Sequence, residues 1–271
     1  MKNNLKKRLI PVILIKDGSV VQSIKFKEYK IIGKPITTIS RLNKFGSDEI
    51  ILLDISKDKI YKMDRQEDNF EHNKNFLDLI NKVSQINFVP LSAGGGIRSL
   101  NDIENYLKSG CDKVVINTLC IDKIELINKA AKIFGSQCLI GSIDYKLKDN
   151  RNIVIKNGSE DTNIKAIDHA KKLFDNGIGE IMINSVDRDG LKKGYDIKFT
   201  EQIVSSIDLP IISCGGAGSW DDMYILAKET NCDAVAASNI FHHVEYSTYV
   251  AKQYLFEKKL NFRNPKLFDE K

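Results

Sequence analysis

Two short glycine-rich phrases, AGGGIR at 93–98 and SCGGAG at 213–218, lie about 120 residues apart, and each follows an apolar run typical of a buried strand. Each is followed by a polar helix-like stretch and then by a second apolar run that ends in small polar residues, DKVVINT or DAVAASN. A repeat of this length indicates that one half of the chain duplicates the other. Glycine lets the phosphate of a ligand approach backbone N–H groups, and the start of the following helix adds a favourable dipole. The pattern therefore predicts two phosphate sites, one in each half.

Apolar runs alternate with amphipathic stretches along the whole chain of 271 residues. We expect strands near 9–15, 49–54, 88–93, 113–117, 138–144, 179–184, 210–214 and 233–237, and helices near 35–45, 74–86, 100–109, 122–133, 163–176, 197–206, 220–229 and 246–257. Eight β–α units predict an α/β fold, a (β/α)8 TIM barrel built from two duplicated half-barrels, as a single domain over 1–271. A doubly wound sheet is the alternative, which the half-barrel repeat disfavours. Functional residues of such a barrel lie on the loops after the strands.

The composition restricts the partners and the compartment. The net charge of +5 comes from 41 basic and 36 acidic residues spread along the chain, which disfavours nucleic-acid binding. The first apolar run, Leu9 to Ile15, is too short for a signal peptide, and no run is long enough to span a membrane. The five cysteines lie in or beside apolar runs, which indicates buried thiols in a reducing cytoplasm. No CxxC or histidine spacing suggests a metal site, so we expect neither a metal nor a cofactor.

Phrases spread over nearly the whole chain carry a resemblance to a known family. They include LLDI at 52–55, GGGIR at 94–98, SIDYK at 142–146, SVDRDGLKKGYD at 185–196 and SCGGAG at 213–218, of which the fourth is the most specific. In this order they resemble the cyclase subunit of imidazole glycerol phosphate synthase, a lyase of histidine biosynthesis. The resemblance implies a TIM barrel that receives ammonia from a class-I glutaminase subunit at its N-terminal face. It also implies that the ammonia passes to a bis-phosphate substrate at the C-terminal face.

The family has two catalytic carboxylates, at the ends of the first and fifth strands, and this chain has one of them. Asp144 is the fifth-strand carboxylate, whereas the first-strand position is Leu14, which cannot move a proton. Losing a catalytic acid or base typically lowers a rate by about 10²–10⁴. Four more positions at the substrate end depart from the family, where it has a lysine, two threonines and a serine: Gln22, Asn184, Leu191 and Cys214. We therefore expect the chain's own cyclase activity to be weak.

The opposite end of the barrel keeps the charged ring of the family. Four residues at strand starts match the family's ammonia gate in type and sign: Arg8, Glu49, Lys113 and Glu180. Asp112 matches the acidic residue that faces the glutaminase. The structural alternative is that strand starts are wet and tend to be charged. The complete set of four favours a retained ammonia entrance.

Further candidates lie after the strands. Asp189 in the DRDG phrase is a second candidate catalytic residue, with a turn-forming Asp-Gly as the alternative. The residues predicted to bind phosphate or substrate are Gly94, Gly95, Gly96, Asn117, Asn184, Gly215, Gly216, Ser238 and Asn239. The alternative for these positions is tight packing by small residues. His242 and His243 are expected near the same face. KFKEY at 25–29 is expected as a mobile, charged loop over this face, with a solvated turn as the alternative. The segment 57–75 is expected as a long loop that serves binding or is a tolerated insertion.

Three functions stay open. The first is an ammonia-conducting subunit, similar to the cyclase-like barrels of surface-polysaccharide gene sets, which also lack the first-strand aspartate. There, a separate sugar amidotransferase is thought to convert an acetamido group into an acetamidino group. The second is an authentic cyclase of histidine biosynthesis with a substitute acid, and the third is a non-catalytic scaffold for a phosphorylated or nucleotide sugar. Glutaminase binding separates the first two from the third, and turnover of the histidine-pathway substrate separates the first from the second.

Overall fold

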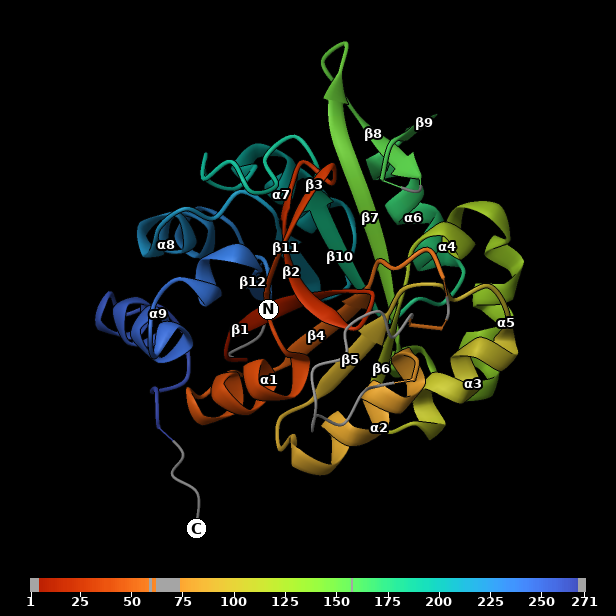
Figure 1. Cartoon of the computed structure of the whole chain (residues 1–271). Coiled ribbons are helices and arrows are strands. Elements are labelled where there is room, and N and C mark those ends of the chain that lie inside the picture. Colours follow the sequence, from red (N-terminus) through yellow and green to blue (C-terminus); the bar gives the residue numbers. More distant parts are fainter. Residues whose placement is uncertain (1–4, 59, 62–73, 157, 268–271) are drawn as a thin grey trace.

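The computed structural model describes residues 5–58, 60–61, 74–156 and 158–267. Eight parallel strands in this part of the chain form a closed barrel (Figure 1). The ring closes because β12 pairs with β1 and β7 pairs with β10. In ring order the strands are β1 (Arg8–Lys16), β4 (Ile50–Asp54), β5 (Leu91–Gly94), β6 (Lys113–Ile116), β7 (Leu139–Lys148), β10 (Glu180–Ser185), β11 (Ile211–Cys214) and β12 (Ala234–Ala237). The expected (β/α)8 barrel is confirmed, and a doubly wound sheet is excluded.

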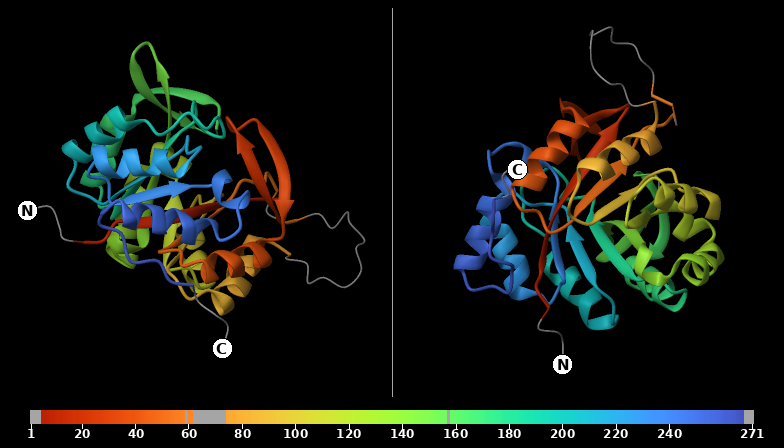
Figure 2. Two further views of the ribbon diagram at one scale, coloured as in Figure 1. Left: turned by 90° about the vertical axis from the view of Figure 1, so that its left-hand side faces the viewer. Right: turned by 90° about the horizontal axis from the view of Figure 1, so that it is seen from below.

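Helices surround the barrel, as the view from below in Figure 2 shows. Two of them begin in the same way in the two halves of the chain, because the hydroxyls of Ser99 and Ser219 accept the N–H groups of Asp102 and Asp222. None of the described helices is long and apolar enough to cross a membrane. The helices are α1 (Pro35–Lys44), α2 (Phe76–Ile86), α3 (Leu100–Lys108), α4 (Thr118–Asp122), α5 (Ile124–Phe134), α6 (Ala166–Asp175), α7 (Ile197–Ser206), α8 (Trp220–Glu229) and α9 (Ser247–Glu257), with 3-10 turns η1 (Ser136–Cys138) and η2 (Asn239–His242).

Two antiparallel extensions stand above the C-terminal ends of the barrel strands. β2 (Ser19–Ile24) and β3 (Glu28–Gly33) form a hairpin after β1, which we call the flap (residues 19–33). β8 (Arg151–Lys156) and β9 (Glu160–Lys165) extend β7 into a second hairpin sheet. The prediction that 25–29 is a loop was wrong, because only Lys25, Phe26 and Lys27 turn and β3 begins at Glu28. The helix expected from 163 starts at Ala166, because 163–165 belong to β9.

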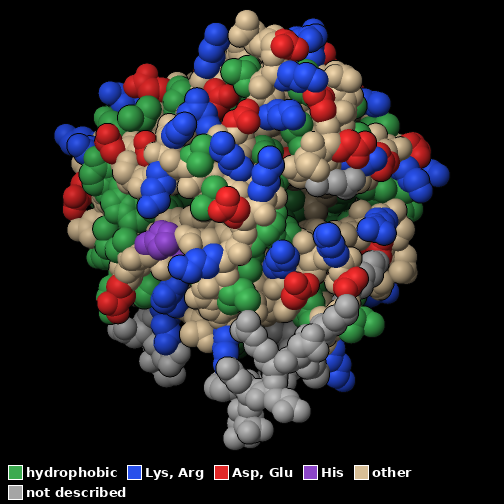
Figure 3. Space-filling model, turned by 45° about the horizontal axis from the view of Figure 1, so that its top comes forward, with side chains coloured by type: hydrophobic (Ala, Val, Ile, Leu, Met, Phe, Trp, Pro, Cys, Tyr) green, Lys and Arg blue, Asp and Glu red, His purple; other side chains and the backbone are tan. Residues whose placement is uncertain are grey.

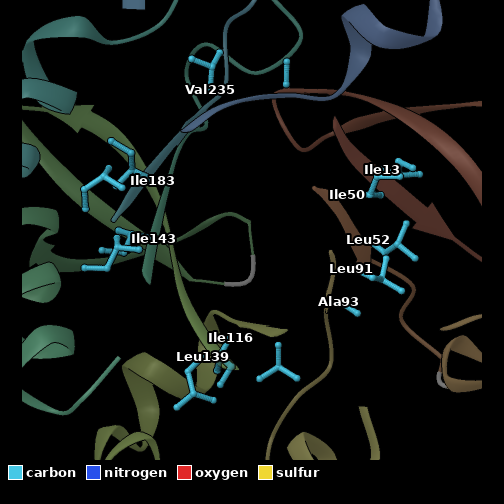
Figure 4. Packing of buried hydrophobic residues seen from close by; sticks show 14 of the residues in the cluster. Ile13, Ile50, Leu52, Leu91, Ala93, Ile116, Leu139, Ile143, Ile183 and Val235 are labelled. Atoms are coloured by element: carbon cyan, nitrogen blue, oxygen red, sulfur yellow. The ribbon is translucent and has the colours of Figure 1, made fainter. Parts of the chain in front are cut away.

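Two apolar layers stabilise the barrel. The outer layer lies between strands and helices, and Figure 4 shows part of it, including Ile13, Leu52 and Ile143. The alternate side chains of the strands fill the barrel itself, where the inner layer consists of Ile10, Val12, Ile51, Val115, Ile140, Met182, Ile212, Cys214, Ala234 and Ala236. Burial of both strand faces explains why the strands appear as continuous apolar runs in the sequence. Four of the five cysteines are buried as expected, whereas Cys138 is partly exposed.

Candidate functional site

Asp144 lies in the middle of β7, opposite Asn184 near the C-terminal end of β10, and two amide side chains enclose its carboxylate. The Asn117 side chain donates from Nδ2 to Asp144 Oδ2 at 2.7 Å, and Asn184 donates from Nδ2 to Oδ1 at 3.3 Å. Asp144 is only 9% exposed. Burial raises its pKa to about 7, although both amide donors act to lower it. A carboxyl with this pKa can accept or release a proton near neutral pH.

Leu14 lies on the opposite side of the barrel at the same level. It pairs with Leu53 in the ladder of β1 and β4, just as Asp144 pairs with Asn184 in the ladder of β7 and β10. Leu14 and Leu53 are half-buried and pack on the inner apolar layer, which includes Cys214. One side of the barrel mouth is therefore apolar, and the other side carries the carboxylate and its two amides.

The glycine-rich turns have a packing reason for glycine. A Cβ on Gly94, Gly95 or Gly216 would collide with the backbone oxygens of Val115, Asp54 and Gly194 respectively, and one on Gly215 would meet Ser185 O at 2.9 Å. A Cβ on Gly96 would point into open space, and only its φ of +67° favours glycine there.

Two buried polar atoms beside these turns have no hydrogen-bond partner among the described residues. They are Asn117 Oδ1 and Ser238 Oγ, which follow β6 and β12 and so occupy equivalent places in the two halves. Buried polar atoms are normally paired, so both are available to a bound ligand. Asn239, predicted to bind ligand, instead contacts the flap: its Nδ2 donates to Ser23 O at 2.7 Å.

Asp189 also contacts the flap rather than an open site. Its Oδ2 accepts from Ser23 Oγ at 2.7 Å and from Phe26 N at 3.4 Å. Burial raises the pKa of Asp189, and these hydrogen bonds act against the rise.

The two histidines after β12 differ in their surroundings. His243 is exposed, and its Nε2 lies 2.5 Å from Gln22 Nε2 of the flap. His242 is more buried, and burial lowers its pKa to about 4. Basic and acidic side chains are interspersed over this end of the molecule (Figure 3). The flap carries the exposed Lys25, Lys27 and Lys30.

At the N-terminal end, the four charged residues form one closed ring. Arg8 bonds both Glu49 (2.7 Å) and Glu180, and Lys113 Nζ lies 3.2 Å from both Glu49 oxygens and 2.8 Å from Glu180 Oε2. Burial alone would raise the pKa of Glu180, but Arg8 and Lys113 outweigh it and hold the pKa below its ordinary value. Ser92, which sequence reasoning did not identify, donates from Oγ to Glu49 Oε1 at 2.6 Å. A serine within a buried strand run carries no signal that distinguishes this role from packing.

Asp112 is exposed at the same end, and its carboxylate accepts the N–H of Leu91 at 2.8 Å. Asp233 does the same for Ile211 at 2.9 Å in the other half of the chain. The Asp112 carboxylate therefore has a structural role that does not depend on a partner protein. Beside it lies an open groove of about 370 Å³, lined by Ser84, Asn87, Phe88, Val89, Pro90, Leu91, Gly110 and Asp112. Phe88 is 58% exposed there.

The predicted insertion at 57–75 lies largely outside the described residues. Its two ends meet at the bridge of Ile60 with Asn75 and at the hydrogen bond from Tyr61 N to Lys74 O. Sequence reasoning also missed Ser23, although the flap holds to the barrel through it. Its partners are more than 160 positions away, so no local pattern could have indicated them.

Comparison with known proteins agrees with this geometry. The family model described as "Histidine biosynthesis protein" matches residues 8–247. The imidazole glycerol phosphate synthase subunit HisF of Clostridium botulinum (strain 657 / Type Ba4) is 36% identical, over 96% of this chain and 99% of its own length. The HisF subunit of Bacillus cereus (strain G9842) matches equally, at 36% identity over the same shares. The putative imidazole glycerol phosphate synthase subunit hisF2 of Vibrio vulnificus (strain YJ016) is 40% identical, over 97% of this chain and 93% of its own length. The chain therefore belongs to the histidine biosynthesis protein family, as a HisF-like cyclase subunit of the imidazole glycerol phosphate synthase type.

Proposed function

We propose that this chain is an ammonia-receiving barrel with little cyclase activity of its own, which works with a class-I glutaminase subunit. Ammonia enters at the ring of Arg8, Glu49, Lys113 and Glu180 and leaves at the mouth beside Asp144. There it is used to amidate a surface-polysaccharide sugar, with acetamidino formation by a separate amidotransferase. The observation that carries the proposal is a contrast between the two ends of the barrel. At the N-terminal end, every charged side chain of the ring has its ion-pair partners. At the C-terminal end, the position across the barrel from Asp144 is Leu14 instead of a second carboxylate.

The ring suits selective entry of a small neutral molecule. Its four charges alternate in sign and satisfy one another, so the closed ring keeps its members paired in a largely buried place. The ring has no net charge, so the barrier to an ammonium ion is the large desolvation cost that a dry barrel imposes on any ion. Neutral ammonia does not meet this barrier. Passage requires one bridge of the ring to open, and docking of a partner on this face supplies the differential contacts for that change.

The interior supports the same route. The inner layer consists of aliphatic side chains, Met182 and Cys214, with small residues on β12, where Ala234 and Ala236 face inward. These side chains fill the barrel, so ammonia moves through it by small side-chain displacements rather than through an open pore. The apolar lining prevents protonation on the way. Ammonia then reaches Asp144, the one carboxyl at the mouth with a pKa raised to about 7, which can take up or supply a proton there.

The mouth fits a phosphorylated or nucleotide-sugar ligand. Asn117 Oδ1 and Ser238 Oγ are buried polar atoms beside the glycine turns, and Gly96 leaves space for an approaching group. The flap carries exposed lysines, whose positive charge favours an anionic ligand. Backbone N–H groups at the glycine turns add donors for phosphate oxygens.

The alternative is an authentic cyclase of histidine biosynthesis, and the 36% identity to HisF subunits over 96% of the chain favours it. The relative that is 40% identical is also named as a putative imidazole glycerol phosphate synthase subunit, hisF2. The first reading therefore depends on Leu14 at the barrel mouth and not on the comparisons. The test uses the chain co-purified with a class-I glutaminase subunit of the same organism. We expect a stable heterodimer by size-exclusion chromatography, and at most trace cyclisation of the histidine-pathway bis-phosphate with ammonium salts. Turnover at about 1–10³ s⁻¹, the ordinary range for enzymes, would establish the alternative. Absence of any complex would remove the ammonia route from both.

A further inference from the structure

Ser23 connects the flap to two loops of the barrel through hydrogen bonds. It is 1% exposed and has partners on two different loops. Its Oγ donates to Asp189 Oδ2 in the loop after β10, and its backbone is bracketed by the Asn239 amide in η2 after β12. Asn239 Nδ2 donates to Ser23 O at 2.7 Å, and Ser23 N donates to Asn239 Oδ1 at 3.4 Å. Ser23 is therefore held from two sides, in addition to the pairing of β2 with β1 and the contact of Gln22 with His243.

The tip of the flap has a backbone that is unfavourable without outside contacts. Lys25 and Phe26 have φ values of 51° and 59°, in the left-handed region that is unfavourable for residues other than glycine. Both N–H groups of this turn point to Asp189: Lys25 N donates to its carbonyl oxygen at 3.1 Å and Phe26 N to Oδ2 at 3.4 Å. One residue thus provides the acceptors that make this turn tolerable.

The neighbours of Asp189 in sequence also accept or donate hydrogen bonds that hold adjacent segments in place. Asp187 Oδ2 accepts from Leu147 N of β7 at 2.8 Å, and the guanidinium of Arg188 donates to Gly194 O at 3.2 Å within its own loop. Gly190 packs so closely on the flap that a Cβ there would collide with Ser23 O. The Asp187–Gly190 segment therefore braces both extensions of the barrel, with Asp189 assigned to the flap.

We propose that Asp189 is a positioning residue, which fixes the flap over the barrel mouth through Ser23 and the Lys25–Phe26 turn, and is not a group that exchanges protons with a substrate. Its Oδ2 already has two donors in the closed flap. The closed flap also places Tyr29, whose hydroxyl donates to Phe26 O and whose ring lies 4.5 Å from Lys16 Nζ, at the mouth. Fixing the flap therefore sets which side chains a ligand meets above Asp144.

Amide hydrogen exchange of the purified chain alone tests this, and the result does not depend on the function proposed above. In Asp189→Ala we expect the Phe26 amide to exchange roughly ten- to a hundredfold faster, because its carboxylate acceptor is lost, with the barrel strands unchanged. The Lys25 amide keeps its acceptor, the Asp189 carbonyl, and should exchange faster only because the turn loses the bonds of Ser23 and Phe26 to the carboxylate. Asp189→Asn retains an acceptor oxygen for Ser23 and Phe26, so its flap should exchange within about threefold of wild type. Ser23→Ala should loosen the same amides as Asp189→Ala.

The matched control is Asp187→Ala, which removes a carboxylate two residues away that bonds β7 and not the flap. It should loosen Leu147 and leave Lys25 and Phe26 as in wild type. Unchanged flap exchange in both Asp189→Ala and Ser23→Ala would overturn the proposal. So would faster exchange spread evenly over the barrel strands, since that marks a general loss of stability. If Asp189→Ala fails to fold, Ser23→Ala decides alone by the same criterion.

Discussion

Leu14 and Asp144 occupy equivalent positions on opposite sides of the barrel, the first paired with Leu53 and the second with Asn184. The two half-barrels therefore present different chemistry at the same level of the mouth. An acid–base reaction that needs two opposed carboxylates finds only Asp144 at this mouth, because Leu14 stands at the second position. Substitutions at these two positions test the consequence directly.

Restoring the second carboxylate should restore cyclisation. In Leu14→Asp we expect turnover of the histidine-pathway bis-phosphate with ammonium salts to rise by about 10²-fold or more over wild type. Leu14→Asn, which has nearly the same shape and polarity but cannot transfer a proton, is the control and should stay at the wild-type level. Equal gains in both variants would mean that polarity, not proton transfer, limits the reaction.

Asp144 should make stability depend on pH near neutrality. Its folded pKa of about 7 lies above the ordinary value of 3.8, so its favourable contribution is present below pH 4 and is lost as the pH rises through about 7. Asp144→Asn does not titrate. The free energy of unfolding of the variant relative to wild type should therefore rise between pH 4 and pH 8, by up to about 4 kcal/mol. Urea titrations across this range measure it, and a difference independent of pH would contradict the raised pKa.

The charged ring should be costly to break. Glu49 is 1% exposed and accepts from Arg8, Lys113 and Ser92. Glu49→Gln keeps its size but removes the charge that these groups share, so we expect a loss of about 2–4 kcal/mol in the free energy of unfolding. Glu104→Gln, which breaks an exposed pair with Lys108, is the control and should cost about 0.5 kcal/mol or less. Equal effects would mean that the ring is solvated like any surface pair.

Asp112 should matter more to a glutaminase complex than its structural counterpart. Asp112→Lys and Asp233→Lys both remove a carboxylate that accepts a strand N–H, so their effects on stability should be similar. Only Asp112→Lys should weaken the complex, by about 2–5 kcal/mol if the new charge is desolvated at the interface. Titration calorimetry with the glutaminase measures both. A complex weakened equally by Asp233→Lys would place the interface over the whole face rather than at Asp112.

The barrel could be predicted from the sequence because every strand is a continuous apolar run and the helices have one apolar stripe. The flap could not, because its turn at Lys25 and Phe26 uses left-handed residues other than glycine, and the contacts that stabilise it come from Asp189 and Asn239. The sequence placed Asp144 and the ring at opposite ends of the barrel correctly. It could not indicate that the Asp189 side chain would bond the flap, because its partners Ser23 and Phe26 lie more than 160 positions away along the chain.

The matching carboxylates Asp112 and Asp233 have a consequence for how this barrel can change over time. Each fixes the start of a strand in its half, far from the end of the barrel where Leu14 and Asp144 differ. The elements that secure the architecture and the residues that select a reaction are thus spatially segregated along the same strands. A lineage can rewrite its chemistry at one rim while inheriting its scaffold unaltered at the other.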